Sequence, residues 1–281
     1  MSLIRRQLLT AGAAGLAFSG LARFAHAQSE ETYINEVEGY GPLKTDPAGL
    51  MDLPEGFTYQ VISQSGDTMD DGLFVPGQPD GMGCFDLGGG RVALVRNHEL
   101  KGSSALHRNL GPGGLHQERI NGVDASRAYD TYKDGRPLPG GTTTLVYDLE
   151  RRQTVREYLS LIGTSTNCCG GITPWGSWLT CEENVELPET DDVTKPHGFV
   201  FEVPATAEGL VEPVPLKAMG RFDHEAVCID PRTGIVYLTE DMNDGLFYRF
   251  IPNVADRLAE GGKLQAMVIR GQGGADTRNQ D

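Results

Sequence analysis

One arrangement recurs three times along this chain: a β-prone segment that ends in acidic residues. The copies are RVALVRNHEL (91–100), SWLTCEENVE (177–186) and IVYLTEDMND (235–244). A shorter strand-like segment precedes each copy and two more follow it, so four consecutive strands are predicted three times over. Repeated four-stranded sheets are typical of β-propeller blades. We therefore predict an all-β chain with about three blades of a β-propeller, rather than the unrelated hairpins of a sandwich.

The other strands of each unit follow from the same pattern. They are 81–87, 141–149 and 154–161 in the first unit, 170–175, 197–204 and 213–219 in the second, and 225–230, 245–252 and 264–270 in the third. FTYQVIS (57–63) is predicted as one more strand, which would complete a last blade. Closed propellers have about four to eight blades, so we expect these residues to be part of a longer fold with an open sheet edge here.

The acidic residues are predicted to lie at one end of all three sheets. In an antiparallel hairpin, the start of the first strand and the end of the second lie at the same end. The starts are Asp80, 167–169 and 223–225, and the ends are His98 with Glu99, Glu182 with Glu183, and Glu240 with Asp241. Carboxylates held this close raise each other's pKa unless a cation is bound. We therefore expect a metal site near the axis of the blades.

The stretch TNCCGGITPWGSWLTCEEN (166–184) gathers two adjacent cysteines, a glycine pair and both tryptophans of the chain at this end of the second unit. Gly170 and Gly171 would permit a close approach of backbones. Trp175 and Trp178 are predicted to pack between blades rather than to contact a ligand.

The adjacent cysteines are candidate metal ligands. Side chains of neighbouring residues in extended backbone point to opposite sides, so only one of Cys168 and Cys169 can face the acidic residues. A thiolate there would select a transition metal, and oxygen ligands beside it suit calcium. A vicinal disulfide, a disulfide to Cys181 and plain buried thiols are the alternatives. Cys84, Cys181 and Cys228 lie inside predicted strands, where burial is expected.

The first 27 residues predict an export signal. An arginine pair at positions 5 and 6 precedes a mildly apolar run over 8–21, and the sequence AHA (25–27) offers a small-x-small cleavage site. The run is broken by glycines and shorter than the ~20 apolar residues of a membrane span, so no stable span is expected. The Arg-Arg-x-Leu-Leu arrangement indicates the bacterial twin-arginine export machinery, and hence a periplasmic or secreted protein with one domain over 28–281.

The chain is also strongly acidic, which limits the kinds of partner that it is expected to bind. It carries 24 basic and 39 acidic residues, a formal net charge of −15, and loss of three arginines with the signal would make this −18. Nucleic acid is therefore not expected as a partner. A Ser/His/Asp hydrolase is disfavoured as well, because the sequence has no Gly-x-Ser-x-Gly motif.

Several of these segments resemble the PhoX-type alkaline phosphatase family. They are RNHE (96–99), NCCGG (167–171), TPWG (173–176), CEEN (181–184) and GRFDHE (220–225), and the likeness extends from about residue 43 to the end. The resemblance implies an exported six-bladed propeller that hydrolyses phosphate monoesters at an axial site holding ferric iron and calcium. It makes Cys168 the iron-bound thiolate and Glu225 a bridging carboxylate. It also implies further metal ligands among Glu99, Glu182, Glu183, Glu240 and Asp241.

The family's phosphate-binding arginine is expected beyond residue 281. The segment 101–140 is rich in Gly and Pro and is predicted to be a long surface loop, with His107 and His116 solvated. Two function classes stay open: a metal-dependent phosphatase acting on a small phosphorylated substrate, and a calcium-stabilised scaffold or binding module without catalysis. A lactonase with calcium on the axis is a third alternative.

Overall fold

The computed structural model describes residues 39–104 and 123–276 of the chain, and the predicted export signal lies outside them. The chain divides into two compact units with the boundary between Gln60 and Val61. In the first unit, β1 (Leu43–Lys44) and β2 (Leu53–Pro54) form an antiparallel pair. Asp46 organises the turn between them, accepting hydrogen bonds from the Leu50 N–H (2.8 Å) and the Tyr59 hydroxyl (2.6 Å).

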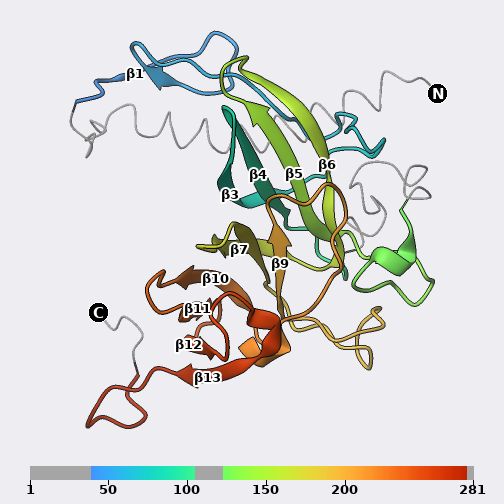
Figure 1. The fold of residues 1–281 in the computed structure, drawn as a ribbon, viewed down its shortest axis with the longest axis vertical. Coiled ribbons are helices and arrows are strands. Elements are labelled where there is room, and N and C mark those ends of the chain that lie inside the picture. The colour runs from blue at the N-terminus through green and yellow to red at the C-terminus, as the bar shows by residue number, and fades with distance from the viewer. Residues whose placement is uncertain (1–38, 105–122, 277–281) are drawn as a thin grey trace, which may run out of the picture. The chain divides into compact units, whose positions relative to one another are not determined.

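The second unit is built from three antiparallel sheets. The first contains β3 (Pro79–Gly88), β4 (Arg91–His98), β5 (Gly140–Asp148) and β6 (Gln153–Thr164); the second β7 (Asn167–Ile172), β8 (Ser177–Glu182) and β9 (Val200–Pro204); the third β10 (His224–Ile229), β11 (Val236–Glu240), β12 (Phe247–Pro252) and β13 (Gly262–Ala266). The sheets follow one another in chain order (Figure 1). This confirms the all-β class and the predicted four strands of the first and third sheets.

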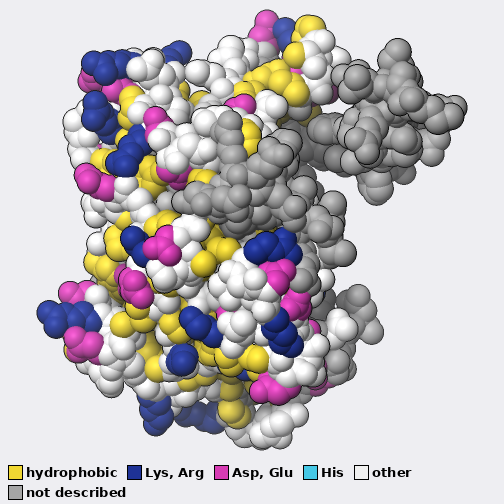
Figure 2. All heavy atoms as spheres, turned by 90° about the vertical axis from the view of Figure 1, so that its right-hand side faces the viewer, with side chains coloured by type: hydrophobic (Ala, Val, Ile, Leu, Met, Phe, Trp, Pro, Cys, Tyr) yellow, Lys and Arg dark blue, Asp and Glu magenta, His cyan; other side chains and the backbone are white. Residues whose placement is uncertain are grey.

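Helical structure among the described residues is confined to short 3₁₀ turns at Ala125–Arg127, Lys217–Met219 and Leu258–Glu260. None of the helical segments in 39–104 and 123–276 has the length and apolar character needed to cross a bilayer. Figure 2 shows acidic, basic and hydrophobic side chains interspersed on one face, with no histidine visible among the coloured residues. His98, His197 and His224 are all buried.

The predicted fourth strand of the second sheet, 213–219, is wrong. Pro215 makes only an isolated bridge to Phe201, and the chain then enters the 3₁₀ turn Lys217–Met219. Pro213 and Pro215 have no N–H to donate, so this segment cannot build a continuous ladder.

The predicted strand 57–63 is also wrong, since these residues adopt no regular structure. Part of the reason lies on β6, where carboxylates occupy backbone N–H groups that a strand would need. Asp70 accepts from the Glu157 N–H (2.7 Å), and Asp71 accepts from the Leu159 N–H (2.7 Å). Ile62 is attached through a side chain instead, its carbonyl accepting from the Thr154 hydroxyl (2.9 Å).

The segment 101–140 is not simply a surface loop. His107 and His116 lie outside the described residues, but the part of the segment after residue 123 is packed against the protein. Tyr132 and Leu138 are fully buried and form a small core with Val193. The neighbouring Tyr129 N–H donates to the Ile162 carbonyl at the end of β6 (2.9 Å).

The sheets pack on one another through apolar faces. Trp178 lies in the cluster shared by the first and second sheets, together with Phe85, Val95 and Phe201. This confirms the prediction that Trp178 packs between sheets. The second and third sheets meet more closely still, because a Cβ atom added to Gly171 would lie 2.1 Å from the Val227 carbonyl oxygen. Glycine at this position therefore allows β7 to lie against β10.

Candidate metal centre

The three sheets share one irregularity, a β-bulge at the start of the first strand. The register runs Pro79↔His98 to Met82↔Arg96 in the first sheet, Asn167↔Glu182 to Gly170↔Thr180 in the second, and His224↔Glu240 to Val227↔Leu238 in the third. Each time two residues lie opposite one, which bends the strand and redirects its side chains. The predicted alignment of strand starts with strand ends is confirmed in all three hairpins.

The three bulges lie against one another. The Asn97 side-chain amide, held by the Trp178 indole N–H (2.9 Å), donates to the carbonyls of Cys168 (3.0 Å) and Cys169 (2.7 Å). The Cys168 thiol in turn lies 3.4 Å from the His224 carbonyl oxygen and 3.6 Å from that of Glu225. The first strands of the three sheets thus bring their bulged residues to one place.

Three side chains converge there. Ligand atoms of Cys168, Glu183 and Glu225 all lie within 4.8 Å of one another. Burial, a hydrogen bond with Asp241 and the charge of Glu225 raise the pKa of Glu183 to about 7. Burial likewise raises the pKa of the Cys168 thiol. One thiol and two carboxylates in a partly buried cluster form a donor set that fits a transition-metal ion, whose charge would favour their ionised forms.

Further carboxylates border this cluster. Burial and the charges of Asp80 and Glu225 raise the pKa of Glu99, while Lys101 acts in the opposite direction. On the third sheet, burial and the charges of Glu240 and Asp241 raise the pKa of Asp223. Oxygen donors of this kind are the ligands that calcium prefers.

A cavity of about 420 Å³ adjoins the cluster. Its lining residues are Gln78, Glu99, Lys101, Ser104, Thr166 and Glu183. Thr166 is unusual in two respects: its φ is +54°, and its buried hydroxyl has no hydrogen-bond partner among the described residues. A β-branched residue rarely adopts this left-handed backbone, so the surrounding structure must hold Thr166 in place.

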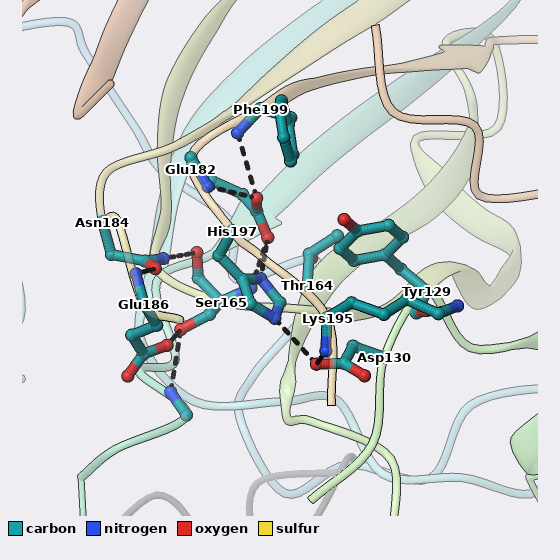
Figure 3. Close-up of polar contacts among 12 residues, drawn as sticks. Tyr129, Asp130, Thr164, Ser165, Glu182, Asn184, Glu186, Lys195, His197 and Phe199 are labelled. Atoms are coloured by element: carbon teal, nitrogen blue, oxygen red, sulfur yellow. Dashed lines mark hydrogen bonds and ion pairs between the residues drawn. The ribbon is translucent and has the colours of Figure 1, made fainter. Parts of the chain in front are cut away.

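The second strands end in acidic pairs whose members point in different directions. Glu182 is fully buried, and its carboxylate accepts from the backbone N–H groups of Ser165 (3.0 Å), Gly198 (2.9 Å) and Phe199 (3.1 Å) and from His197 Nδ1 (2.6 Å) (Figure 3). The structure does not bring Glu182 into the cluster of Cys168, Glu183 and Glu225.

Glu240 behaves in the same way on the third sheet, accepting from the Leu246 N–H (2.9 Å) and the Tyr248 hydroxyl (3.0 Å). Since successive side chains alternate along extended backbone, the following residues, Glu183 and Asp241, are the ones near the cluster. In the first hairpin His98 takes the place of Glu182 and Glu240, contacting Gly77 O and Thr143 Oγ1 through its two ring nitrogens (2.9 Å each).

A family model described as "Alkaline phosphatase PhoX" matches residues 38–278. The chain belongs to the PhoX family. Its fold is similar to that of Pseudomonas fluorescens PhoX, which was solved in complex with vanadate, a transition state analogue; the TM-score is 0.52 and the identity 17%, covering 76% of this chain and 52% of that one. The chain thus spans about half the length of this solved relative. None of the curated proteins matches it.

The cysteines of this PhoX chain are all free, so neither of the two disulfides considered as alternatives forms. Cys168 and Cys181 are buried, as expected for thiols inside the sheets. The expected burial of Cys84 and Cys228 is wrong, because both are exposed. Their neighbours in the strands, Phe85 and Val227, take the buried face instead.

Three residues of this region have no counterpart among the sequence-based predictions. Asp130 and His197 are fully buried beside Glu182, and Thr166 lines the cavity. Asp130 and His197 lie in loops 67 residues apart, so no spacing or periodicity in the sequence links them. Thr166 could have been noticed only as a β-branched residue in the short turn between two strands.

Proposed function

We propose that this chain supplies the metal-binding part of the active site of an exported PhoX phosphatase that hydrolyses phosphate monoesters. The observation that carries the proposal is the convergence of Cys168, Glu183 and Glu225 within 4.8 Å in a chain of this family. The vanadate complex of the structurally similar protein supports phosphoryl chemistry. Family membership favours this function over a calcium-stabilised scaffold, which would need no thiol in the cluster.

The donor set favours ferric iron at Cys168, Glu183 and Glu225, with calcium at the oxygen ligands around it. Glu99 and Asp241 are the best-placed of these, and Asp80 extends the set. Such metals polarise a phosphoryl oxygen and provide an oxygen nucleophile, so no serine nucleophile is required. We leave Glu182 and Glu240 out of the ligand set because protein donors already occupy their carboxylates.

The chain's own residues offer a place for the substrate beside these ligands. The 420 Å³ cavity borders Glu99 and Glu183 and is also lined by Lys101 and Ser104. An ammonium and a hydroxyl are suitable partners for phosphate oxygens. We therefore place the phosphate group of a small phosphorylated substrate in this cavity.

The fold and location complete the proposal. Three consecutive sheets with equivalent bulges and touching first strands would be consecutive blades of a β-propeller, with six blades in the complete fold. The twin-arginine signal predicted over 1–27 would take the folded protein to the periplasm or beyond the cell.

Metal analysis combined with two cysteine variants tests the function. Cys168→Ala should lose iron, visible thiolate-to-metal absorption and hydrolysis of p-nitrophenyl phosphate, because it removes the soft ligand. Cys169, which is half-buried and lies outside the cluster, is the matched control: Cys169→Ala should keep all three and lose about 1 kcal/mol of stability. Calcium without iron in the parent protein would instead identify a scaffold.

A further inference from the structure

We propose that Glu182, held by the buried pair of His197 and Asp130, is a positioning residue that fixes Glu183 and Thr166 at the metal centre. The inference rests on the proposed function, because it needs a metal centre at Cys168, Glu183 and Glu225. Glu182, His197 and Asp130 form the most completely buried ionic group in the described part of the chain. Their side chains are 0% exposed.

Glu182 is connected to the metal centre by its position in the chain and by hydrogen bonds. Glu183 follows Glu182 directly, and the Glu183 N–H donates to the Thr166 carbonyl (2.9 Å). The Glu182 carboxylate accepts from the N–H of Ser165 (3.0 Å), the residue before Thr166. The segments 165–166 and 182–183 are therefore joined twice, once through the backbone and once through the Glu182 side chain.

Hydrogen bonds hold the Glu182 side chain in one conformation. Both carboxylate oxygens are occupied, Oε1 by Ser165 and His197 and Oε2 by the N–H groups of Gly198 and Phe199. His197 is fixed from its other side by Asp130 (3.1 Å), as Figure 3 shows. A carboxylate with four donors has no second rotamer that would satisfy them, so its backbone is held as well.

His197 is held in the charged form that binds both acids. Burial alone would lower the pKa of His197, but the charge of Glu182, the hydrogen bonds and the charge of Asp130 raise it to about 10. Asp130 is anchored in turn by the N–H groups of Thr194 (3.0 Å) and Lys195 (2.9 Å). A chain of contacts thus runs from the loop at 194–199 through Glu182 to the backbone of Glu183.

The same network holds Thr166 in a strained backbone conformation. Thr166 has φ +54°, and its N–H is directed to the Leu100 carbonyl (3.1 Å) while its own carbonyl accepts from Glu183. Strained residues persist only where the surroundings over-determine them. Ser165 supplies that constraint, since its N–H is bound by Glu182 and its hydroxyl donates to Glu186 (2.8 Å). Thr166 and Glu183 both line the cavity.

The third hairpin lacks this arrangement among the described residues. Glu240, at the equivalent position of the third hairpin, accepts from two donors and has no ionic partner among the described residues. The second hairpin contributes two of the three clustered side chains, Cys168 and Glu183, whereas the third contributes only Glu225. The more elaborate support therefore lies where the geometry of two ligands depends on it.

The test compares two Glu→Gln substitutions in the full chain. Glu182→Gln removes the charge that holds His197, and Glu202→Gln is the matched control in the same sheet, because Glu202 accepts from the Trp175 indole N–H (2.6 Å) and from Ser177 at the opposite end of β8. Cobalt(II) is the probe, since a Cys168 thiolate bound to it gives a charge-transfer absorption. Melting temperatures measured in parallel separate lost stability from lost positioning.

We expect Glu182→Gln to bind cobalt about 10- to 100-fold more weakly than the parent and to shift the charge-transfer band at saturating metal. Glu202→Gln should lower the melting temperature yet leave affinity and band unchanged. If Glu182→Gln does not fold, His197→Gln, which keeps the carboxylate and removes its charged partner, carries the same comparison. Equal affinity and an unshifted band in the variant that folds would overturn the positioning role alone, whereas a parent protein that binds no metal would overturn the proposed function itself.

Discussion

The β7–β8 and β10–β11 hairpins have the same register and the same bulge, yet they differ in what surrounds them. Every residue of β8 is buried, whereas only Val236 and Leu238 are buried in β11. The second sheet lies between two others, and the third shares an apolar core only with the second among the described residues. The same hairpin backbone is therefore packed between two sheets in one case and against one sheet in the other.

One aligned position shows what this difference does to the sequence. Counted from the bulge, Gly171 of β7 corresponds to Cys228 of β10. Gly171 faces the Val227 carbonyl at close range, while Cys228 is exposed. The residue type at this position thus reports whether another sheet covers the strand, and not a difference in the fold of the hairpin.

The largest effect is expected at this aligned position. Gly171→Ala would place a Cβ atom 2.1 Å from the Val227 oxygen, so the two sheets would have to separate. We expect a loss of about 4 kcal/mol or more in the free energy of unfolding, measured by urea denaturation. The control Cys228→Ala should change it by no more than about 0.5 kcal/mol. Similar losses in both variants would show that the third sheet is covered as tightly as the second.

Thiol labelling should separate the two hairpins almost completely. Cys228 on β10 is exposed, whereas Cys181 on β8 is fully buried and burial raises its pKa well above the ordinary value. A maleimide reagent should therefore modify Cys228 in the folded protein and reach Cys181 only on unfolding. Mass spectrometry of peptides labelled with and without urea provides the measurement, and rapid labelling of Cys181 in the native protein would contradict the burial of β8.

How much of this comparison could be predicted from the sequence depends on the range of the interaction. The sequence predicts correctly that strand starts and strand ends lie together, because hairpin geometry is local and the acidic pairs mark the strand ends. Side-chain alternation predicts that Glu182 and Glu183 point in opposite directions. It does not predict which of them lies near Cys168, because the bulge at 168–169 redirects the side chains of the partner strand. The extent of sheet covering, which decides that Cys228 is exposed, is a property of tertiary packing.

The errors have equally specific causes. The segment PVPLKAM is apolar enough for a strand, but the missing N–H groups of Pro213 and Pro215 prevent a ladder. The pairing of His197 with Asp130 joins two distant loops and leaves no local pattern. By contrast, Cys168, Glu183 and Glu225 could be expected to approach one another, because each lies at a strand end of a repeated unit.

A pH titration tests the buried ionic support of Glu182 in the second hairpin, which Glu240 of the third hairpin lacks among the described residues. The pKa of His197 is raised to about 10, above its ordinary value of 6.5, so its contribution to stability is complete below about pH 6.5 and is lost as pH rises through 10. The free energy of unfolding should fall with increasing pH across this window, with a slope of up to about 1.4 kcal/mol per pH unit from this group. In His197→Gln this component should vanish, as the difference between parent and variant unfolding curves at pH 7, 8 and 9 will show. Parallel curves would mean that His197 is neutral in the folded protein.

The smallest effect is expected at the end of the third hairpin, where Glu240 occupies the position of Glu182. Its carboxylate accepts from the Leu246 N–H in an exposed contact and from the Tyr248 hydroxyl in a partly buried one. Glu240→Gln keeps an acceptor for these donors, and water can replace what is lost, so we expect a change below about 1 kcal/mol in the free energy of unfolding. Glu182→Gln leaves His197 beside an amide in a buried site, which should cost about 3 kcal/mol. Urea denaturation at pH 7 measures both changes in the free energy of unfolding. Their ratio compares the buried second hairpin with the less buried third hairpin. Equal costs would show that burial of the second hairpin contributes nothing to holding its acidic residue.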